Sequence, residues 1–441
     1  MIFMDKQVVN VFWFRRDLRI DDNTALSKAL QSGLPVLPVF IFDPLILDKL
    51  EDREDARVSF IYKSLQAINQ QLNKLGSSLL VLHQKPLEAW QHLSNIYHID
   101  TVFTNSDYEP YARSRDEAVA KLLKSRSVNF SEYKDHVIFE KDEILKSTRE
   151  PYTVFTPYKN KWLEKFLADE YSLKSSTSAA ERRNFFKCRY PLPDLETFGF
   201  KPSSLQIPVI KYENINKTYA ETRDIPSIEG TARTSVHLRF GTISIREVAS
   251  HALQNNAHTW LSELIWRDFY FMIIWHFPET VDHAFKRAYD NIRWRNDEQE
   301  FKAWCAGKTG YPIIDAGMRQ LNTTGWMHNR VRMVTASFLC KHLLIDWRWG
   351  EAYFAKKLLD YDLASNVGGW QWAAGSGNDA APYFRIFNPE LQMKKFDPQL
   401  RYVRQWVKEY DDAFAYPQPI VDHKEARARV LTEYKRALAE P

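Results

Sequence analysis

Cysteine is scarce in this sequence of 441 residues, and long apolar segments are missing. Cys188, Cys305 and Cys340 stand far apart and lack metal-ligand spacing, so we predict reduced packing residues and no bound metal. No apolar run reaches the roughly 20 residues of a membrane-spanning helix, and Met1 to Asn10 lacks the pattern of a signal peptide. We therefore expect a cytoplasmic protein with no membrane partner.

Glycine is also rare where a nucleotide-binding turn would need it. The first 140 residues contain only Gly33 and Gly76. A Rossmann-type dinucleotide site depends on a glycine-rich turn after the first strand, so none is predicted here. The net charge of only +4 likewise excludes a histone-like basic protein. Nucleic-acid binding would then require a local basic face, which an average charge neither reveals nor excludes.

Residues 1–140 alternate short apolar runs with amphipathic stretches. Strands are predicted at residues 8–14, 36–42, 79–82 and 101–104, and helices at residues 23–31, 56–75 and 112–123. Nearly continuous apolar strands that alternate with helices indicate a parallel sheet covered on both faces. We predict an α/β domain with a doubly wound, Rossmann-like sheet.

The rest of the chain has a different pattern. Residues 141–205 form a predicted connector, because its stretches 175–183 and 190–204 are rich in serine, proline and charge. Residues 206–441 are predicted to form an all-α domain. Helix-period apolar spacing occurs at residues 244–255, 260–277, 311–323, 329–342 and 347–359.

Tryptophan is concentrated in the predicted helical domain. Eleven of the 14 tryptophans lie between Trp260 and Trp406. Large aromatic residues fill helical cores, and we assign most of these tryptophans to packing.

Two glycine-containing motifs raise the question of phosphate binding. Gly307-Lys308-Thr309 fails as a P-loop, because Lys302 stands at the first glycine position and no strand precedes it, so a helix–helix turn is predicted. The segment from Gly230 to Ser235 joins hydroxyls, an arginine and a helix start. That combination suits either an anion cradle or an ordinary N-cap.

Polar residues also occur where a helical core is expected. Asp360, Asp362 and Asn366 have spacings that predict one face of a turn, and Gly368 to Trp372 follow them. Buried acids and amides need polar partners, and a polar ring system edged by aromatics would supply them. Glu263 and Arg267 lie four apart, as in a surface ion pair. The apolar residues around them favour a helix that lines a pocket.

These residues belong to longer motifs that resemble the photolyase/cryptochrome flavoproteins, most closely the bacterial class I cyclobutane pyrimidine dimer photolyases. The resemblance covers nearly the whole chain. Its motifs are Phe12-Trp13-Phe14-Arg15-Arg16-Asp17-Leu18-Arg19, Trp266-Arg267-Asp268-Phe269-Tyr270, Gly325-Trp326-Met327-His328-Asn329-Arg330, residues 368–374, residues 381–389 and residues 416–421.

The resemblance implies FAD in the helical domain. It places Tyr219, Thr231, Thr234 and Ser235 near the phosphates and ribityl chain. Trp260, Arg267, Asn329, Arg332, Asp360, Asp362 and Asn366 would lie nearer the rings. Within this second set, Arg332 and Asp360 would form a charge pair beside the isoalloxazine, and Asn366 would face its N5. The likeness favours the anion cradle over the N-cap for residues 230–235.

The same resemblance implies a lesion pocket and a route for electrons. Glu263, Trp266, Arg267, Asn329, Met333 and Trp372 would meet a flipped-out dimer, and Arg223 and Arg330 would hold the flanking phosphates. Trp294, Trp347 and Trp370 would carry electrons from the surface to FAD. The implied activity is light-dependent splitting of cyclobutane pyrimidine dimers in damaged DNA by excited FADH⁻, performed by a monomer.

A second, antenna chromophore is expected in the α/β domain. Folate-binding relatives carry Asn-Glu where this chain has Tyr111 and Ala112. The stretch from Tyr108 to Arg113 is similar to deazaflavin-type members, which favours 8-hydroxy-5-deazaflavin over methenyltetrahydrofolate; an empty or flavin-filled pocket is the alternative. The residues implied for this site are Asp43, Arg57, Asp107 and Glu109.

Three other functions are consistent with parts of this pattern. A cryptochrome photoreceptor would share the fold, since fold does not fix function. A (6-4) photolyase would carry histidines where this chain has Asn329 and Met333. A thermal flavin oxidoreductase would normally need a nicotinamide-binding site, and the first domain lacks the glycine-rich turn that such a site requires. Repair of cyclobutane dimers is the function that we expect.

Overall fold

The computed structural model describes residues 7–168, 178, 180–212, 215 and 218–439, so residues 169–177 and 179 of the predicted connector lie outside the described part. The chain forms two compact units, neither of them continuous in sequence. Unit 1 comprises Met1–Glu140, Lys165–Pro208 and Thr234–His251, and unit 2 comprises Lys141–Glu164, Val209–Arg233 and Ala252–Pro441. The predicted domains are continuous segments, and their boundaries stay predictions.

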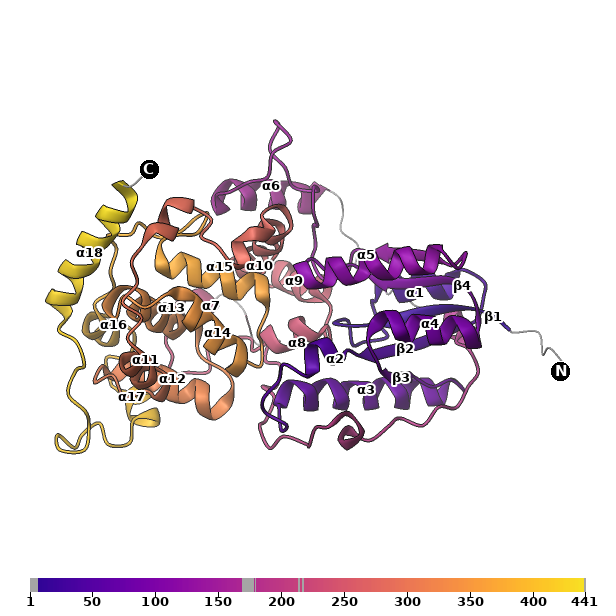
Figure 1. Cartoon of the computed structure of the whole chain (residues 1–441), viewed down its shortest axis with the longest axis horizontal. Helices are drawn as coiled ribbons and strands as arrows, with labels where there is room; N and C mark the ends of the chain where they lie inside the picture. The colour runs from indigo at the N-terminus through magenta and orange to yellow at the C-terminus, as the bar shows by residue number, and fades with distance from the viewer. Residues whose placement is uncertain (1–6, 169–177, 179, 213–214, 216–217, 440–441) are drawn as a thin grey trace. The chain divides into compact units, whose positions relative to one another are not determined.

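Unit 1 is built on a parallel sheet whose strands lie in the order β3-β2-β1-β4-β5 (Figure 1). The strands are β1 (Val8–Phe14), β2 (Val36–Phe42), β3 (Leu80–His83), β4 (His98–Asn105) and β5 (Asn129–Tyr133). The predicted doubly wound α/β fold is confirmed. β5 was not predicted, because its sequence, NFSEY, is only partly buried and too polar to be recognised as a strand.

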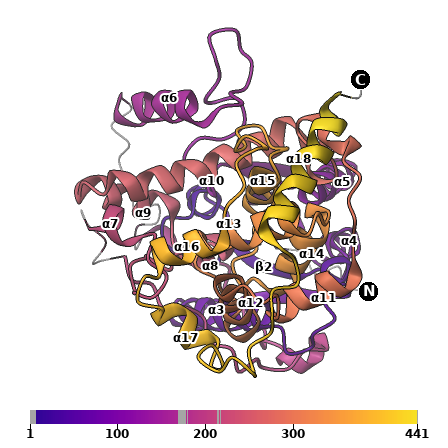
Figure 2. The same cartoon turned by 90° about the vertical axis from the view of Figure 1, so that its left-hand side faces the viewer.

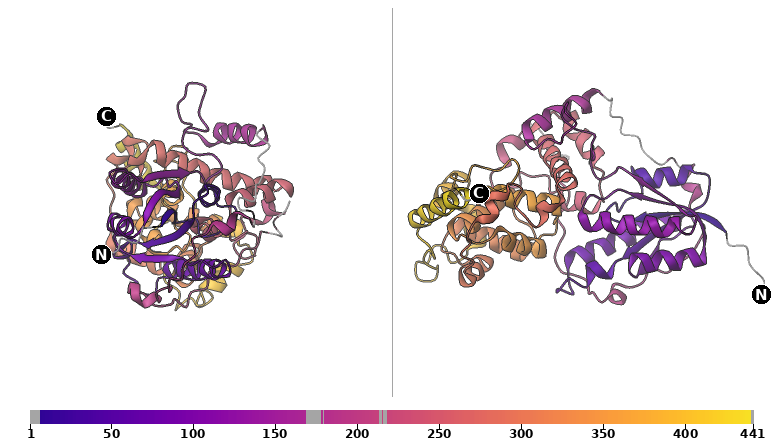
Figure 3. Two further views of the ribbon diagram at one scale, coloured as in Figure 1. Left: turned by 90° about the vertical axis from the view of Figure 1, so that its right-hand side faces the viewer. Right: turned by 45° about the horizontal axis from the view of Figure 1, so that its top comes forward.

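Helices cover both faces of this sheet (Figure 3). The helices that begin in unit 1 are α1 (Thr24–Gln31), α2 (Pro44–Leu47), α3 (Ala56–Lys74), α4 (Pro86–Ile96), α5 (Pro110–Lys124), α8 (Ser235–Phe240) and α9 (Ile245–Gln254), with 3₁₀ turns η1 (Glu181–Asn184) and η2 (Leu195–Phe198). One core lies between the sheet and the helices α4 and α5, where Trp13 meets Trp90 edge to face at 5.4 Å.

A buried ion network ties the loop after β1 to α9 within unit 1. Arg19 and Arg246 each donate to Asp135 at 2.7 Å, and Arg246 Nε also lies 3.0 Å from Asp22. Burial raises the pKa of Asp135, but the two guanidinium charges outweigh it and lower the pKa well below its ordinary value. The loop from Arg19 to Asp22 is therefore held rigidly.

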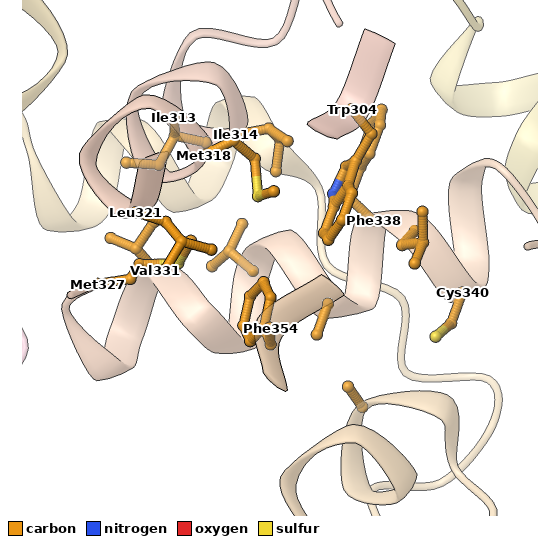
Figure 4. Close-up of a cluster of buried hydrophobic side chains, with 14 of the residues drawn as sticks. Trp304, Ile313, Ile314, Met318, Leu321, Met327, Val331, Phe338, Cys340 and Phe354 are labelled. Atoms are coloured by element: carbon orange, nitrogen blue, oxygen red, sulfur yellow. The ribbon is translucent and has the colours of Figure 1, made fainter. Parts of the chain in front are cut away.

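Unit 2 is helical, and α6 (Phe155–Ala168) crosses the sequence boundary between the units. Its helices are α7 (Tyr219–Thr222), α10 (His258–His276), α11 (Glu298–Ala306), α12 (Pro312–Thr324), α13 (Asn329–Ser337), α14 (Trp347–Lys357), α15 (Leu363–Ala374), α16 (Pro389–Phe396), α17 (Arg401–Trp406) and α18 (His423–Ala439), with 3₁₀ turns η3 (Pro278–Val281) and η4 (Arg287–Asn291). Figure 2 shows α10 and α15 side by side, and the two helices are in contact. The core of the unit gathers Trp304 of α11, the apolar face of α12 and Phe354 of α14 (Figure 4).

Two local predictions need correction. The helix predicted over residues 329–342 ends at Ser337, and a π-helical segment, η5 (Phe338–His342), continues it. The turn predicted around Asp362 and Asn366 is instead the first turn of α15, in which the Asp362 side chain accepts from Ser365 N at 3.4 Å. Gly368 and Gly369 disfavour a helix, but Gly368 packs against the Tyr270 ring of α10, and this tertiary contact overrides the propensity.

Two further features bear on the predicted function. In the part of the chain that the structure describes, no helix is long and apolar enough to cross a membrane. The same described residues contain no group of three or more His, Cys, Asp or Glu side chains that would hold a metal ion.

Candidate functional site

The acidic residue Glu263 lies on α10, a helix that is mostly buried and apolar. Its carboxylate forms an ion pair with Arg223, at the end of α7, and both side chains are partly exposed. Arg267 places its guanidinium over the Phe271 ring at 4.8 Å. The structure therefore pairs Glu263 with a residue 40 positions away, and the i,i+4 alternative with Arg267 is not the pair observed.

The two tryptophans predicted to flank a lesion are both partly exposed. Trp266 stacks on Phe155 with ring centroids 3.7 Å apart and also contacts Tyr270 at 5.4 Å. Trp372, on α15, lies 6.4 Å from Phe387. One face of the Trp266 indole is thus covered by Phe155, whereas the Phe387 ring is tilted relative to Trp372 and does not stack on it.

Helix α13 supplies the next group of predicted residues. His328 caps the helix by accepting from Arg330 N at 3.2 Å, which sets Asn329 at its first turn and Met333 one turn later. Arg330 donates to Asp224 at 2.8 Å and lies over the Phe396 ring. Arg223 and Arg330, both predicted to hold phosphates, are therefore paired with acids in the free protein.

The predicted charge pair between Arg332 and Asp360 is present, at 2.9 Å. The second carboxylate oxygen of Asp360, Oδ1, is buried and has no hydrogen-bond partner among the described residues. A buried acceptor without a donor is costly, and a ligand N–H or O–H would satisfy it. A flavin edge or a ribityl hydroxyl has such donors, so this part of the predicted FAD site fits the cofactor.

Asn366 and Asp362 have defined partners on α14 and α15. The amide nitrogen of Asn366 donates to the Glu351 side chain at 2.8 Å, and Asp362 caps α15. Burial raises the pKa of Glu351, and the hydrogen bond from Asn366, which lowers it, only partly offsets this effect. Because the amide nitrogen is committed to Glu351, the carbonyl oxygen of Asn366 is the group that would meet a ligand N–H.

The segment before α8 has the backbone of a tight cradle. At Gly230 a Cβ atom would lie 2.8 Å from Thr222 atoms, and Arg233 adopts a positive φ of 55°. Arg233 also stacks on Trp326 at 3.6 Å, a contact that sequence reasoning missed because no local pattern signals it. Tyr219 is buried in the same unit, and Trp260 stacks near Tyr212 at 5.9 Å.

Thr231 belongs to unit 2, whereas Thr234 and Ser235 belong to unit 1. Thr234 occupies the N-cap position of α8, but its side chain makes no capping bond. The simple N-cap interpretation is therefore wrong for this side chain. The grouping of these residues around FAD phosphates stays a prediction.

The three tryptophans of the predicted electron route all belong to the core of unit 2. Trp370 and Trp347 are buried, and Trp294 is only partly buried at the edge of the same cluster. Trp370 contacts Phe354 at 5.0 Å and Trp304 at 6.1 Å. This gradient of burial suits a path from the interior to the surface, and the route itself stays a prediction.

The predicted antenna residues in unit 1 are engaged with other protein groups. Asp43 caps α2 and accepts from the Tyr111 hydroxyl, and Arg57 pairs with Asp55. Asp107 and Glu109 accept from Arg16 at 3.4 and 2.7 Å. Burial raises the pKa of Asp107, and the nearby cations, first Arg16, lower it far below its ordinary value.

Fold and site together define a two-unit protein whose helical unit has the polar groups to hold a flavin. Comparison with known proteins agrees. The sequence matches the DNA photolyase family over residues 10–178 and the FAD binding domain of DNA photolyase over residues 260–415. The chain belongs to the DNA photolyase family, within the photolyase/cryptochrome flavoproteins.

Relatives match over nearly their full length. The deoxyribodipyrimidine photo-lyase of Escherichia coli is 37% identical, with 97% of this chain and 98% of that protein covered. The enzyme of the same name from Alkalihalophilus pseudofirmus is 36% identical, covering 96% and 97%. The predicted likeness to class I enzymes in particular stays a prediction.

Solved structures share the whole fold. A bacterial class III photolyase from Agrobacterium tumefaciens superposes with a TM-score of 0.84 at 33% identity, covering 99% of both chains. An archaeal photolyase from Sulfolobus tokodaii, which holds two FAD molecules, gives a TM-score of 0.80 at 35% identity, covering 97% of this chain and 99% of that one. A Synechocystis cryptochrome gives 0.85 at 25% identity, covering 98% and 100%.

Proposed function

We propose that this protein is a light-dependent DNA repair enzyme that splits cyclobutane pyrimidine dimers with FAD. The proposal rests on two neighbouring residues of α10, the ion-paired carboxylate Glu263 and the partly exposed tryptophan Trp266. They occur in a chain that is similar over nearly its full length to deoxyribodipyrimidine photo-lyases. Bound reduced FAD, once excited, would supply the electron that opens the cyclobutane ring.

The chain itself would position the damaged bases. Trp266 and Trp372 offer flat apolar faces, on which a flipped pyrimidine pair would pack. Glu263 would hydrogen-bond the polar edge of the dimer, accepting from N–H when ionised and donating to a carbonyl when protonated. Asn329 and Met333 of α13 would complete the wall.

Arginines would bind the DNA backbone beside that pocket. Arg223 and Arg330 are paired with Glu263 and Asp224 in the free protein. Phosphates would compete with these carboxylates for the guanidinium groups. Such an exchange would release the Glu263 carboxylate as the DNA arrives, so that it becomes available to the lesion.

FAD binding would depend on the buried polar groups of unit 2. Asp360 Oδ1 would accept from the cofactor while Arg332 neutralises the carboxylate from the other side. Unit 1 would hold a second, light-harvesting chromophore, for which 8-hydroxy-5-deazaflavin is favoured over methenyltetrahydrofolate. We expect the enzyme to act as a monomer in the cytoplasm.

The rival function is blue-light signalling, as in cryptochromes of the same fold. The decisive assay exposes a dimer-containing oligonucleotide to blue light with fully reduced protein and follows the return of thymine absorbance. We expect recovery in the light and none in the dark. Reduced, intact protein that binds the lesion no better than plain DNA and restores no absorbance would support signalling instead. A (6-4) lesion substrate, which we expect to remain unrepaired, serves as the specificity control.

A further inference from the structure

The loop that follows α15 holds the start of α6 through two hydrogen bonds. The Asp379 carboxylate accepts from Phe155 N at 2.9 Å, and the Asn378 side chain donates to Thr153 O at 3.1 Å. Phe155 is the first residue of α6. The first N–H groups of a helix have no partner within it, and a carboxylate there also meets the positive end of the helix dipole. Asp379 therefore stabilises the start of α6 from 224 residues away in the chain.

Phe155 in turn covers one face of the Trp266 indole. The two rings are stacked, with centroids 3.7 Å apart and an angle of 9° between their planes. Phe155 is buried, and the Phe269 ring meets it edge to face at 5.7 Å. Aromatic contacts of this kind favour one relative orientation of the rings. The plane of the Trp266 indole thus depends on where the start of α6 places Phe155.

Two further contacts tie α6 to α10 beyond the first turn of α6. The indole N–H of Trp162 donates to Asp268 at 3.0 Å, and the Tyr158 ring lies 5.0 Å from the Phe269 ring. Both contacts are independent of the bond to Asp379. Loss of that bond should therefore loosen the first turn of α6 without unfolding the helix.

Asp379 also lies close to the residues predicted to line the lesion pocket. Burial raises the pKa of the Tyr270 hydroxyl, and the carboxylates of Glu263 and Asp379 raise it further. Tyr270 contacts Trp266 at 5.4 Å. A carboxylate at this place repels DNA phosphates, so direct contact with the DNA backbone does not account for Asp379. Its hydrogen bond to Phe155 does.

We propose that Asp379 is a positioning residue for recognition of the dimer, which holds Phe155 and so fixes the plane of the Trp266 indole before DNA arrives. This inference rests on the proposed repair function, because that function makes Trp266 a wall of the lesion pocket. The loop that contains Asp379 begins at the end of α15, which carries Trp372. One loop therefore links both tryptophans of the pocket. A wall that is already oriented costs less free energy to order on binding.

The orientation of Trp266 is measured first, on the full-length protein with its FAD and without DNA. All tryptophans are replaced by fluorotryptophan, and the fluorine NMR signal that disappears in Trp266→Phe belongs to Trp266. Asp379→Ala should shift or broaden this signal, because Phe155 is no longer held against the indole. Asp379→Asn should keep the parent signal, since the amide oxygen of asparagine still accepts from Phe155 N.

The effect on recognition is then measured as the Kd for dimer-containing DNA and for intact DNA. Asp379→Ala should weaken binding of the dimer about three- to ten-fold, as expected when one hydrogen bond is lost. Phe155→Leu should have a similar effect, because leucine fills the space but does not stack. Affinity for intact DNA should stay the same in both variants. In a Trp266→Ala protein, Asp379→Ala should cause no further loss, since two residues that act through one contact are not additive.

Glu164→Ala is the matched control, because Glu164 is also an acid of α6 but forms an exposed ion pair with Lys161. It should keep the parent signal and the parent affinities. The inference is overturned if Asp379→Ala leaves the Trp266 signal or the preference for the dimer unchanged. It is also overturned if the loss caused by Asp379→Ala adds in full to that of Trp266→Ala. A parent protein that does not prefer the dimer would contradict the proposed function instead, and the Trp266 signal would still decide whether Asp379 holds the indole.

Discussion

At the residue scale, ion pairs decide which groups are ready to bind DNA. Glu263 and Arg223 neutralise each other on the surface of unit 2, and Arg330 does the same with Asp224. Partly exposed pairs of this kind contribute little to stability. Replacing these ion pairs by contacts between the arginines and DNA phosphates would therefore cost little free energy. Low cost is what arginines need if they are to bind phosphate when DNA arrives.

Replacing Glu263 tests this arrangement. Glu263→Ala should keep the fold and FAD, because the ion pair of Glu263 is with Arg223, which is not one of the predicted flavin residues. Loss of a hydrogen bond to the lesion should cost on the order of 1–3 kcal/mol in binding or repair yield. The measurements are the Kd for dimer-containing DNA and the repair yield per absorbed photon.

The control for this prediction is undamaged DNA. Removing the carboxylate frees Arg223 for phosphate, so affinity for intact DNA should stay the same or rise. Equal losses on damaged and intact DNA would contradict a specific contact with the lesion and leave Glu263 a merely structural partner of Arg223.

The sequence predicted the site unevenly at this scale. The Arg332–Asp360 pair followed from family motifs and is present at 2.9 Å. The Glu263–Arg223 pair and the Arg233–Trp326 stack were not predicted, because each joins segments far apart in the chain. Long-range partners depend on tertiary packing, which no local spacing encodes.

At the scale of helices and strands, the spacing of apolar residues predicted an element correctly where one face of that element is buried. α3 and α12 were predicted within one or two residues, since their apolar residues recur with the helical period. The sequence did not predict α15, because Gly368 and Gly369 interrupt it and glycine disfavours a helix. Its helix is stabilised by packing against α10, and such packing is invisible to a propensity argument.

Those two adjacent glycines provide a matched test of this packing. A Cβ at Gly368 would lie 2.2 Å from the Tyr270 ring, whereas a Cβ at Gly369 would meet nothing within 4 Å. Gly368→Ala should therefore destabilise unit 2 by about 1–3 kcal/mol through overpacking. Gly369→Ala should stabilise it by about 0.5–1 kcal/mol, because alanine favours the helix. The measurement is the melting temperature of both variants. Equal shifts in melting temperature would show that α15 does not pack closely against Tyr270.

The electron route is also a property of neighbouring helices, since Trp347 opens α14 and Trp370 lies on α15. Trp370→Phe should abolish light-driven reduction of bound FAD while leaving repair by chemically reduced protein largely intact. Phenylalanine keeps an apolar aromatic ring in the core but is far harder to oxidise than an indole. Flavin absorbance under blue light with an external reductant is the measurement.

Trp406→Phe is the control for that experiment, because Trp406 packs on the edge of the same core and is assigned to packing. Its flavin should be reduced at the parent rate. Reduction of the Trp370→Phe protein at the parent rate would remove Trp370 from the route.

At the scale of the whole molecule, sequence patterns gave the fold class but not the composition of the units. Residues 234–251 look like the start of a helical domain, yet they belong to unit 1. A pocket of unit 1 that is lined by residues within 18–22, 60–71, 206–207 and 237–247 was not predicted either, since its walls come from four separate stretches of the chain. Both features depend on how distant segments assemble.

Buried histidines make the stability of unit 2 depend on pH. His342, in the π-helical segment, hydrogen-bonds His423 of α18 at 2.9 Å and stacks on Phe338. Burial lowers its pKa from 6.5 to about 3, helped by the nearby charges of His423 and Arg429, and burial lowers the pKa of His328 to about 4. Below pH 6.5 these two histidines therefore bind protons in the unfolded chain and stay neutral in the folded chain. Stability is fully present above that pH and is lost as pH falls toward 4.

We expect the urea midpoint of unit 2 to fall between pH 6.5 and pH 4.5, with each histidine contributing at most about 1.4 kcal/mol per pH unit. His342→Gln should make this fall shallower, whatever it does to stability at pH 7.5, because glutamine takes up no proton. The exposed His98 of unit 1 is the control, and His98→Gln should leave the slope unchanged. A His342→Gln protein with the parent slope would show that His342 takes no part in the acid response.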